Sequence, residues 1–407
     1  MQVIVVGGGA SGLLAAGMAA SRGYHVTVVE RNARMARKVM ITGKGRCNVT
    51  NACTVQDCVA NTPGNGRFLY SAFSAFTPQD TMSFFEEQGV PLKVERGNRV
   101  YPVSYKAVDI VDALQSFARS QGCRFKTGRV SRLLLEDDVC CGVELETGET
   151  LPSYAVIVCT GGCSYPGTGS TGDGYTLARQ AGHTVVTPRP SLVALNTLED
   201  WCKDLQGLSL KNCAITVRDT ETGKTIYTDF GEMLFTHFGV SGPIILSAST
   251  HLHNAVSGRY TITLDMKPAL TAEQVDARLL REFEENSNAC VGNILSSLMP
   301  RSMVPVMLRL SDIAGETKCH SVSRPERVRI ATLLKNIPLT VSGLRPFEEA
   351  VVTAGGVSTR EINAKTMESK LVSGLYFAGE VLDVDAYTGG FNLQIAFSTG
   401  YAAGNHV

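Results

Sequence analysis

Two short apolar runs near the start of the chain enclose a longer run with helical spacing. Val3–Val6 and Val26–Val29 contain only valine, isoleucine and threonine, which is typical of buried strands. Residues 13–22 lie between them and predict a helix, and Glu30 follows the second strand directly. Because parallel strands are joined by a crossover helix, the pattern predicts a βαβ unit.

The pattern of apolar positions changes several times further along the chain. Alternation over residues 124–151, with turns at 137–138 and 147–148, predicts a small antiparallel sheet. Ala155–Val158 predicts a buried strand that stops at Thr160 and two glycines. Short β-prone runs follow at 214–217, 225–227 and 260–264, and helical spacing follows at 271–286, 304–310 and 324–334. Strand patterns return at 351–357 and 374–380.

These changes predict an α/β protein with three parts. A nucleotide-binding Rossmann-like domain is expected from residues 1–190 and 346–407. A β-rich domain is expected from 191–270 and 336–345, and a helical insert from 271–335. The length of 407 residues agrees with more than one hydrophobic core.

Composition and charge narrow the class of protein. Hydrophobic residues make up 44% of the chain and charged residues 19%, as in a soluble globular protein. Lys and Arg together number 38, and so do Asp and Glu, so we expect no nucleic-acid or membrane partner. No apolar run approaches the roughly 20 residues that span a bilayer. Twelve cysteines without a CxxC pair, and no signal-peptide pattern, lead us to expect a cytoplasmic protein.

The first candidate site is the glycine motif between the two predicted strands, Gly7-x-Gly9-x-x-Gly12. In a dinucleotide fold, the first glycine makes the tight turn and the second lets the backbone approach a pyrophosphate. The third allows close packing of helix and strand, and the helix N-terminus offers free N–H groups. Glu30 is placed to accept hydrogen bonds from a ribose diol. These residues alone leave NAD and FAD open.

Three later segments favour FAD. The basic segment 31–38 and the loop 41–51 (ITGKGRCNVTN) suit a phosphate or the edge of a ring. Thr160-Gly161-Gly162 should lie beside the pyrophosphate, and Glu380 or Asp383 can hold ribityl hydroxyls. A helix that starts near Asn392 would direct its positive end at the flavin ring. A nicotinamide enzyme has little need of these C-terminal residues, so we expect FAD.

Other candidate groups carry weaker signals. Cys53 and Cys58 have the spacing of the redox pair in flavin disulfide reductases, although no second GxGxxG directly follows a predicted strand as in those enzymes. His237 could be a general acid, but a core or turn histidine is the more ordinary interpretation. Arg99, Tyr101 and Lys106 could bind an anionic or carbonyl substrate, or could simply anchor a loop.

The motifs GKGRCNVTN, LFTHFGVSGP, VTAGGV and GEVLDVDAYTGGFNLQIAFSTG, in this order, resemble the bacterial FAD-dependent oxidoreductases of the BaiN/YhiN type, also called the aminoacetone oxidase family. The resemblance covers essentially the whole chain. It implies a glutathione-reductase-type FAD domain built from both termini, with an inserted β-barrel-like domain and a small helical subdomain. No catalytic acid or base follows from it.

The resemblance and the residue patterns together give one set of expected cofactor-binding residues. This set is Gly7, Gly9, Ala10, Ser11, Gly12, Leu13, Glu30, Arg31, Lys38, Gly45, Arg46, Cys47, Asn48, Val130, Thr160, Gly161, Gly162, Gly379, Glu380, Asp383, Gly390, Asn392, Leu393 and Gln394.

The resemblance implies hydride transfer between FAD and a small organic substrate. The first expectation is NAD(P)H-linked reduction of an enone C=C in a bile-acid-like or steroid-like molecule, with NAD(P)H as a transient donor. Oxidation of a small amine such as aminoacetone is an alternative. A disulfide reductase that uses Cys53 and Cys58, or a flavin redox sensor, is less favoured, and the zero net charge argues against an RNA-modifying enzyme.

Overall fold

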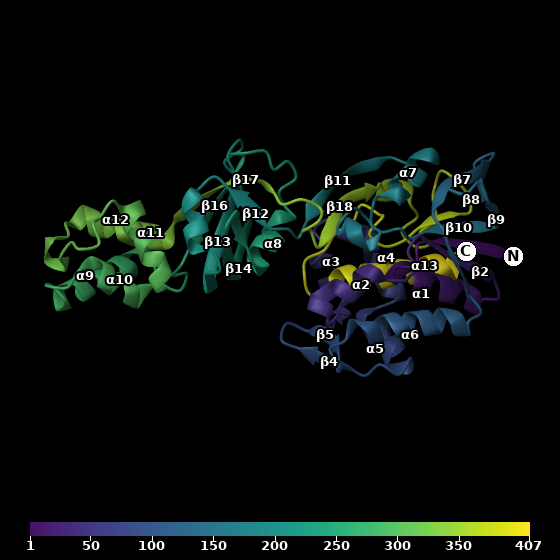
Figure 1. The fold of residues 1–407 in the computed structure, drawn as a ribbon, viewed down its shortest axis with the longest axis horizontal. Helices are drawn as coiled ribbons and strands as arrows, with labels where there is room; N and C mark the ends of the chain where they lie inside the picture. Colours follow the sequence, from purple (N-terminus) through teal and green to yellow (C-terminus); the bar gives the residue numbers. More distant parts are fainter. The chain divides into compact units, whose positions relative to one another are not determined.

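The computed structural model describes residues 1–407 and divides them into two compact units (Figure 1). The first unit contains Met1–Ser191 and Pro346–Val407, and the second contains Leu192–Arg345. The first unit therefore combines both ends of the chain, and the second is a continuous insertion between them.

A parallel five-stranded sheet forms the centre of the first unit, in the order β19-β10-β1-β2-β6. Its inner strands are short and nearly all buried, as expected for a sheet covered on both faces. The strands are β1 (Gln2–Val6), β2 (His25–Glu30), β6 (Arg124–Thr127), β10 (Ala155–Val158) and β19 (Leu375–Phe377).

Helices α1 (Ala10–Ser21) and α13 (Phe391–His406) lie side by side against this sheet (Figure 1). Small residues allow the close approach: a Cβ on Gly400 would lie 2.5 Å from the carbonyl oxygen of Ser11, and one on Gly404 would lie 2.4 Å from that of Ala15. The first and last helices of the chain are therefore packed backbone to backbone. Through this contact, the C-terminal helix belongs to the same compact unit as the glycine motif at the start of the chain.

Three small antiparallel sheets complete the strands of the first unit, in the orders β3-β5-β4, β7-β8-β9 and β11-β18. They are formed by β3 (Thr50–Asn51), β4 (Leu92–Glu95), β5 (Arg99–Pro102), β7 (Val130–Glu136), β8 (Val139–Leu145), β9 (Thr150–Pro152), β11 (Val185–Ser191) and β18 (Val352–Val357). The predicted sheet over 124–151 is wrong at its start. Residues 124–127 form β6 and pair in parallel with β2, because this strand closes the edge of the main sheet.

The other helices of the first unit are α2 (Arg37–Ile41), α3 (Val55–Ala60), α4 (Tyr70–Ala75), α5 (Pro78–Glu87), α6 (Ala107–Ser120) and α7 (Asp173–Gln180). Two of them begin with a reciprocal capping box, formed by Thr54 with Asp57 and by Thr77 with Asp80. In each box the threonine side chain accepts from a backbone N–H while the aspartate accepts from the N-cap backbone. These helix starts are therefore set by local sequence.

The second unit contains a closed barrel in the order β12-β15-β14-β13-β16-β17. Its strands are β12 (Leu195–Thr197), β13 (Ser209–Asp219), β14 (Thr225–Thr236), β15 (Gly239–Ser241), β16 (Tyr260–Asp265) and β17 (Ile337–Leu344). Its helices are α8 (Pro243–Ser249), α9 (Ala272–Glu285), α10 (Val291–Leu298), α11 (Val304–Ser311) and α12 (Arg324–Lys335). Barrel and helices share one hydrophobic cluster, in which Phe235 and Leu279 are fully buried. No helix of either unit combines the length and the apolar character that a membrane span requires.

Candidate functional site

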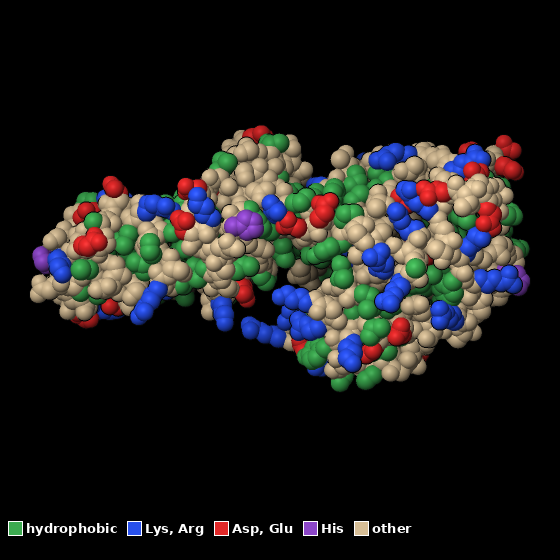
Figure 2. All heavy atoms as spheres, viewed as in Figure 1, with side chains coloured by type: hydrophobic (Ala, Val, Ile, Leu, Met, Phe, Trp, Pro, Cys, Tyr) green, Lys and Arg blue, Asp and Glu red, His purple; other side chains and the backbone are tan.

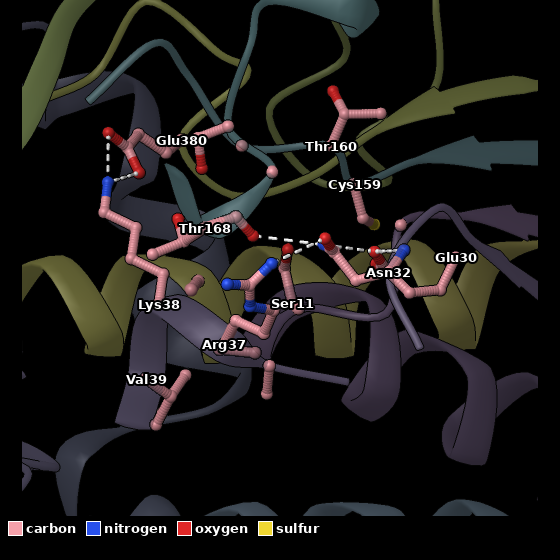
Figure 3. A pocket seen from close by; sticks show the side chains of 18 of the residues that line it. Ser11, Glu30, Asn32, Arg37, Lys38, Val39, Cys159, Thr160, Thr168 and Glu380 are labelled. Atoms are coloured by element: carbon pink, nitrogen blue, oxygen red, sulfur yellow. Dashed lines mark hydrogen bonds and ion pairs between the residues drawn. The ribbon is translucent and has the colours of Figure 1, made fainter. Parts of the chain in front are cut away.

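A pocket in the first unit opens where the parallel strands end (Figure 3). Residues that follow β1, β2, β6, β10 and β19 all contribute to its wall, which is the ligand side of an open α/β sheet. The lining residues are Val6, Gly7, Gly9, Ala10, Ser11, Val29, Glu30, Arg31, Asn32, Ala36, Arg37, Lys38, Val39, Thr42, Gly128, Arg129, Val130, Cys159, Thr160, Gly161, Thr168, Gly169, Ser170, Asp173, Val351, Val352, Glu380, Val384, Asn392, Leu393, Ile395 and Ala396.

The glycine motif shapes one wall of this pocket. Gly7 has a φ of +102°, which a residue with a side chain rarely adopts, and it turns the chain out of β1. A Cβ on Gly12 would lie 1.9 Å from the carbonyl oxygen of Gly7, so only glycine allows α1 to pack this closely. Gly9 is the N-cap of α1 and has no such close neighbour. The second position of the motif is therefore open to a ligand.

The N-terminus of α1 offers unpaired donors to the pocket. Gly9 makes no side-chain cap, so the N–H groups of Ala10, Ser11 and Gly12 have no acceptor within the helix. The aligned peptide dipoles add a partial positive charge at the same place. The site is therefore suited to the pyrophosphate of a dinucleotide.

Glu30 holds the glycine turn in place. One carboxylate oxygen accepts from the backbone N–H of Gly8 at 2.8 Å. The other accepts from the backbone N–H of Asn32 at 2.8 Å and from its side-chain amide at 2.7 Å (Figure 3). Asn32 also donates to the carbonyl oxygen of Thr168 at 3.1 Å. Glu30, the last residue of β2, therefore connects the glycine turn to Asn32, and Asn32 extends this connection to Thr168, around the position expected for the ribose.

Thr160 provides a donor without a protein partner. It follows β10, lines the pocket, and its hydroxyl oxygen is buried without a hydrogen bond. A buried hydroxyl that stays unpaired costs roughly 1–3 kcal/mol. The oxygen lies toward Gly174 of α7, where an added Cβ would be 2.2 Å away, so this hydroxyl is not exposed to the pocket. The neighbouring Cys159 is different, because burial raises the pKa of its thiol to about 12 although Ser11 acts in the opposite direction. This thiol therefore stays protonated.

An ion pair between Lys38 and Glu380 lies in the pocket (Figure 3). The Lys38 ammonium is 2.9 and 2.7 Å from the two carboxylate oxygens of Glu380. Glu380 also accepts from the hydroxyl of Ser164 and from the backbone N–H of Thr353, each at 2.8 Å. The side chains of the pair are 23% and 20% exposed, so both charges are largely removed from water and each is needed to balance the other.

A second charged group lies at the rim. Asp173 accepts two hydrogen bonds of 2.8 Å from Arg129 and one of 3.1 Å from Arg31. Burial acts to raise the pKa of Asp173, but the hydrogen bonds from Arg129 and Thr171 and the charges of both arginines outweigh it and hold the pKa below its usual range. Asp173 is therefore ionised at neutral pH and holds two arginines beside the pocket.

This chain is similar to known proteins along its whole length. The profile of the HI0933-like protein Rossmann domain matches residues 1–406. The chain belongs to the HI0933-like Rossmann family. The BaiN/YhiN resemblance seen in the sequence is thereby confirmed, and with it an FAD-dependent oxidoreductase fold.

Two curated relatives of the family cover almost the whole chain. One is the 3-dehydro-bile acid delta(4,6)-reductase of Clostridium scindens, 31% identical over 99% of this chain and 98% of that protein. The other is the ribosomal RNA dihydrouridine synthase of Haemophilus influenzae, 32% identical over 98% of this chain and 96% of that protein. A protein of the same name from Escherichia coli is 28% identical over 98% and 96%.

Solved structures support the fold. The 3-ketosteroid delta1-dehydrogenase of Sterolibacterium denitrificans has a TM-score of 0.50 at 13% identity, over 99% of this chain and 98% of that one. Mycobacterium smegmatis Sdh1 has a TM-score of 0.51 at 18% identity, over 99% and 67%. At these identities the likeness concerns the fold alone.

The residues present fit FAD in an HI0933-like protein. The free N–H groups of α1, the glycine turn after β1 and the N-terminus of α13 all border one pocket. The sequence-predicted residues that line it are Gly7, Gly9, Ala10, Ser11, Glu30, Arg31, Lys38, Val130, Thr160, Gly161, Glu380, Asn392 and Leu393.

The other predicted residues lie outside the lining of the pocket. They are Gly12, Leu13, Gly45, Arg46, Cys47, Asn48, Gly162, Gly379, Asp383, Gly390 and Gln394. Gln394 is fully buried, and its amide bonds to Thr50, Thr81, Ser398 and the backbone of Phe76, so its side chain holds α13 to its neighbours. Gly390, the N-cap of α13, packs on the backbone of Thr50.

The weaker candidates also lie outside the pocket. Cys53 and Cys58 are in contact with each other, and Tyr101 and Lys106 belong to the region around β5. His237 lies in the turn between β14 and β15, exposed, with its ring against Phe238. Sequence reasoning missed Asn32, Arg129 and Asp173. Arg129 and Asp173 pair across 44 positions, which no local pattern shows. Asn32 lies inside the predicted basic segment 31–38, two residues from its partner Glu30, but was not named on its own.

Proposed function

We propose that this chain binds FAD in the pocket and uses it to reduce a C=C bond conjugated to a carbonyl group, first of all in a cyclic enone of the bile-acid or steroid kind. The observation that carries the proposal is the similarity along the whole chain to a protein named as a reductase of 3-dehydro-bile acid. NAD(P)H is the proposed electron donor. It would act transiently because only the GxGxxG match at Gly7–Gly12 directly joins a strand to a helix, whereas the match at Gly167–Gly172 does not follow a strand directly.

Different residues of the pocket would bind different parts of this cofactor. The α1 N-terminus would hold the pyrophosphate region, and Glu30 with Asn32 the adenosine ribose. When bound, FAD supplies an atom, N5, that can accept or deliver a hydride. The N–H groups at the start of α13 would favour negative charge on the ring. Val352 and Val384 are buried and would give part of the pocket an apolar wall.

Anaerobic mixing tests the direction of the reaction. The purified holoprotein is mixed with NADH or NADPH in the absence of oxygen, and the flavin absorbance near 450 nm is followed. Rapid bleaching, followed by recovery of the absorbance when a 4-en-3-one steroid is added, is the expected result. Bleaching by aminoacetone but not by NAD(P)H would instead establish the amine oxidase. A protein that takes up no FAD would refute both activities.

RNA uridine is a second candidate substrate, and it has its own structural observation. The Arg46 guanidinium lies 5.1 Å from the ring centre of Tyr101, and the Lys93 ammonium lies 3.5 Å from that of Tyr105. Cations interleaved with aromatic rings are typical of surfaces that bind single-stranded nucleic acid. Figure 2 shows Lys and Arg side chains gathered on the part of this unit that carries α2 and β5 in Figure 1.

The local charge supports the same candidate. Residues 31–106 contain 11 Lys and Arg but 5 Asp and Glu, so the zero net charge of the whole chain conceals a basic segment. The uracil ring also contains a C=C bond conjugated to a carbonyl, so the same chemistry would serve both substrates. Two relatives are named for ribosomal RNA dihydrouridine synthesis.

A double variant separates the two candidates. Lys93→Ala/Tyr105→Ala removes a cation and a ring that lie outside the pocket. If RNA is the substrate, binding of a ribosomal RNA transcript weakens and its salt dependence becomes shallower, while steroid-enone reduction is unchanged. Lys203→Ala, an exposed change in the second unit, is the matched control. Equal RNA binding by all three proteins would remove the RNA candidate.

A further inference from the structure

Cys53 and Cys58 form a close thiol pair at the start of α3. Their sulfur atoms are 3.6 Å apart, with Cys53 half-buried and Cys58 fully buried. The two cysteines flank the N-terminal cap of α3. Thr54 is the N-cap and Asp57 completes the capping box, so Cys53 is the residue before the cap and Cys58 the fourth residue of the helix. These are the two positions that pack together in a hydrophobic staple.

We propose that this staple is a redox site, in which Cys53 and Cys58 form a reversible disulfide when the protein meets a hydroperoxide. Helix capping already holds the two sulfur atoms in contact, so closing a bond of about 2.05 Å requires a local shift and no refolding of α3. None of the other cysteines has a sulfur-to-sulfur contact of this kind among the hydrogen bonds of the structure.

The environment distinguishes the two thiols. The hydrogen bond with Cys58 lowers the pKa of Cys53, against the opposing effects of burial and of Asp57. The same contact, followed by burial, raises the pKa of Cys58. Cys53 is also the more exposed sulfur, so it is the one that a peroxide reaches as a thiolate.

The chemistry balances with hydrogen peroxide as the oxidant. The Cys53 thiolate attacks one peroxide oxygen and the O–O bond breaks, so that the sulfur becomes a sulfenic acid. The hydroxide that leaves takes up the proton released by the Cys53 thiol and forms water. The Cys58 thiol then attacks that sulfur, the S–S bond forms and a second water leaves. Two thiols are oxidised and one peroxide is reduced to two waters. A small thiol such as dithiothreitol reverses the reaction by exchange.

The position of the pair connects it to the FAD site. The backbone carbonyl of Asn61, at the end of α3, accepts from the N–H of Tyr387, and Asn65 donates to Asp383. On the other side of the pair, Asn51 donates to the carbonyl oxygen of Gly389 at 3.0 Å. Segment 51–65 therefore holds the stretch that runs from Glu380 to the start of α13. A disulfide would join the two supports of this stretch covalently.

Counting thiols tests the proposal. The full-length protein is treated with hydrogen peroxide and then unfolded, and its free thiols are measured. The expected result is a fall from 12 to 10 per chain, with the tryptic peptide 47–67 lighter by two hydrogens and restored by dithiothreitol. Cys53→Ser and Cys58→Ser should each abolish this change, whereas Cys141→Ser, a half-buried cysteine without a thiol partner, should retain it.

Two results would overturn the proposal. One is an unchanged thiol count at peroxide concentrations that oxidise a free cysteine peptide. The other is a cross-link in peptide 47–67 that involves Cys47 and survives in Cys53→Ser. A second measurement checks the link to the pocket: FAD should leave the oxidised protein more slowly than the reduced one. Equal release rates would reject that link while leaving the disulfide established.

Discussion

Two threonines near the cofactor site provide a test of its buried polar groups because their hydroxyls have opposite environments. The Thr160 hydroxyl is buried beside the pocket without a partner. The Thr353 hydroxyl accepts from the backbone N–H groups of Cys163 and Ser164 at 2.8 and 3.0 Å. Valine has nearly the same shape as threonine and lacks the hydroxyl. The same substitution should therefore have opposite effects on the stability of the apoprotein at the two positions.

The magnitudes follow from the cost of unpaired groups. Thr160→Val removes an unsatisfied hydroxyl, so the free energy of unfolding of the apoprotein should rise by about 1 kcal/mol. The hydroxyl is not exposed to the pocket, so the Kd for FAD should stay within about twofold of the parent value. Thr353→Val leaves two N–H groups without an acceptor and should lower the free energy of unfolding by at least about 2 kcal/mol.

The assay uses two measurements on each variant. Urea unfolding of the apoprotein, followed by far-UV circular dichroism, gives the stability, and flavin fluorescence titration gives the Kd. If Thr160→Val destabilises the apoprotein by as much as Thr353→Val, the hydroxyl of Thr160 has a protein partner. If its Kd for FAD increases about fivefold, the hydroxyl bonds to the cofactor and is not an unpaired group away from the pocket. Either result would refute the reasoning.

Three further predictions concern packing and charge. Gly12→Ala should lower the free energy of unfolding by at least about 2 kcal/mol and abolish FAD binding, because its Cβ would lie 1.9 Å from a carbonyl oxygen; thermal unfolding and FAD titration measure this. Lys38→Met should destabilise the apoprotein by roughly 2–4 kcal/mol in urea unfolding, because it leaves the Glu380 carboxylate without its cation. Asp173→Asn should cost about 1 kcal/mol at pH 7 and progressively less below pH 4. The sign follows from its lowered pKa: the stabilisation is present above the unfolded-state pKa of about 3.9 and is lost as the pH falls through the folded-state value.

Each of the three predictions, for Gly12, Lys38 and Asp173, has a control or a contradicting outcome. Gly167→Ala should be tolerated, since a Cβ there has no neighbour within 4 Å. The double variant Lys38→Met/Glu380→Met should recover part of the stability that Lys38→Met loses, and a strictly additive loss would contradict the ion pair. A difference between Asp173→Asn and the parent protein that stays constant from pH 7 to pH 3 would exclude a pH-dependent contribution of its carboxylate.

Local patterns explain which parts of the fold were predictable. The first βαβ unit, the amphipathic helix near residue 275 and the turn at Asp137–Asp138 agree with the structure, because each depends on residues close in sequence. Strand β6 was misassigned because four residues cannot show whether their partner is the next strand or one placed much earlier in the chain. The pairing of β6 with β2 depends on how all the strands of the main sheet are arranged.

The sequence by itself determined the glycine turn, the acidic residue after β2 and the return of the C-terminus to the nucleotide fold. Those features require a positive φ, a close approach of two backbone segments or the start of a helix. Each of these requirements limits which amino acid can stand at the position, so the sequence shows it. Only the tertiary structure decided which side chains meet. Lys38 and Glu380 are 342 positions apart, and the amide of Gln394 is used inside the core although its position suggested the flavin. A contact between distant residues depends on how whole helices and strands pack, and no local pattern contains that information.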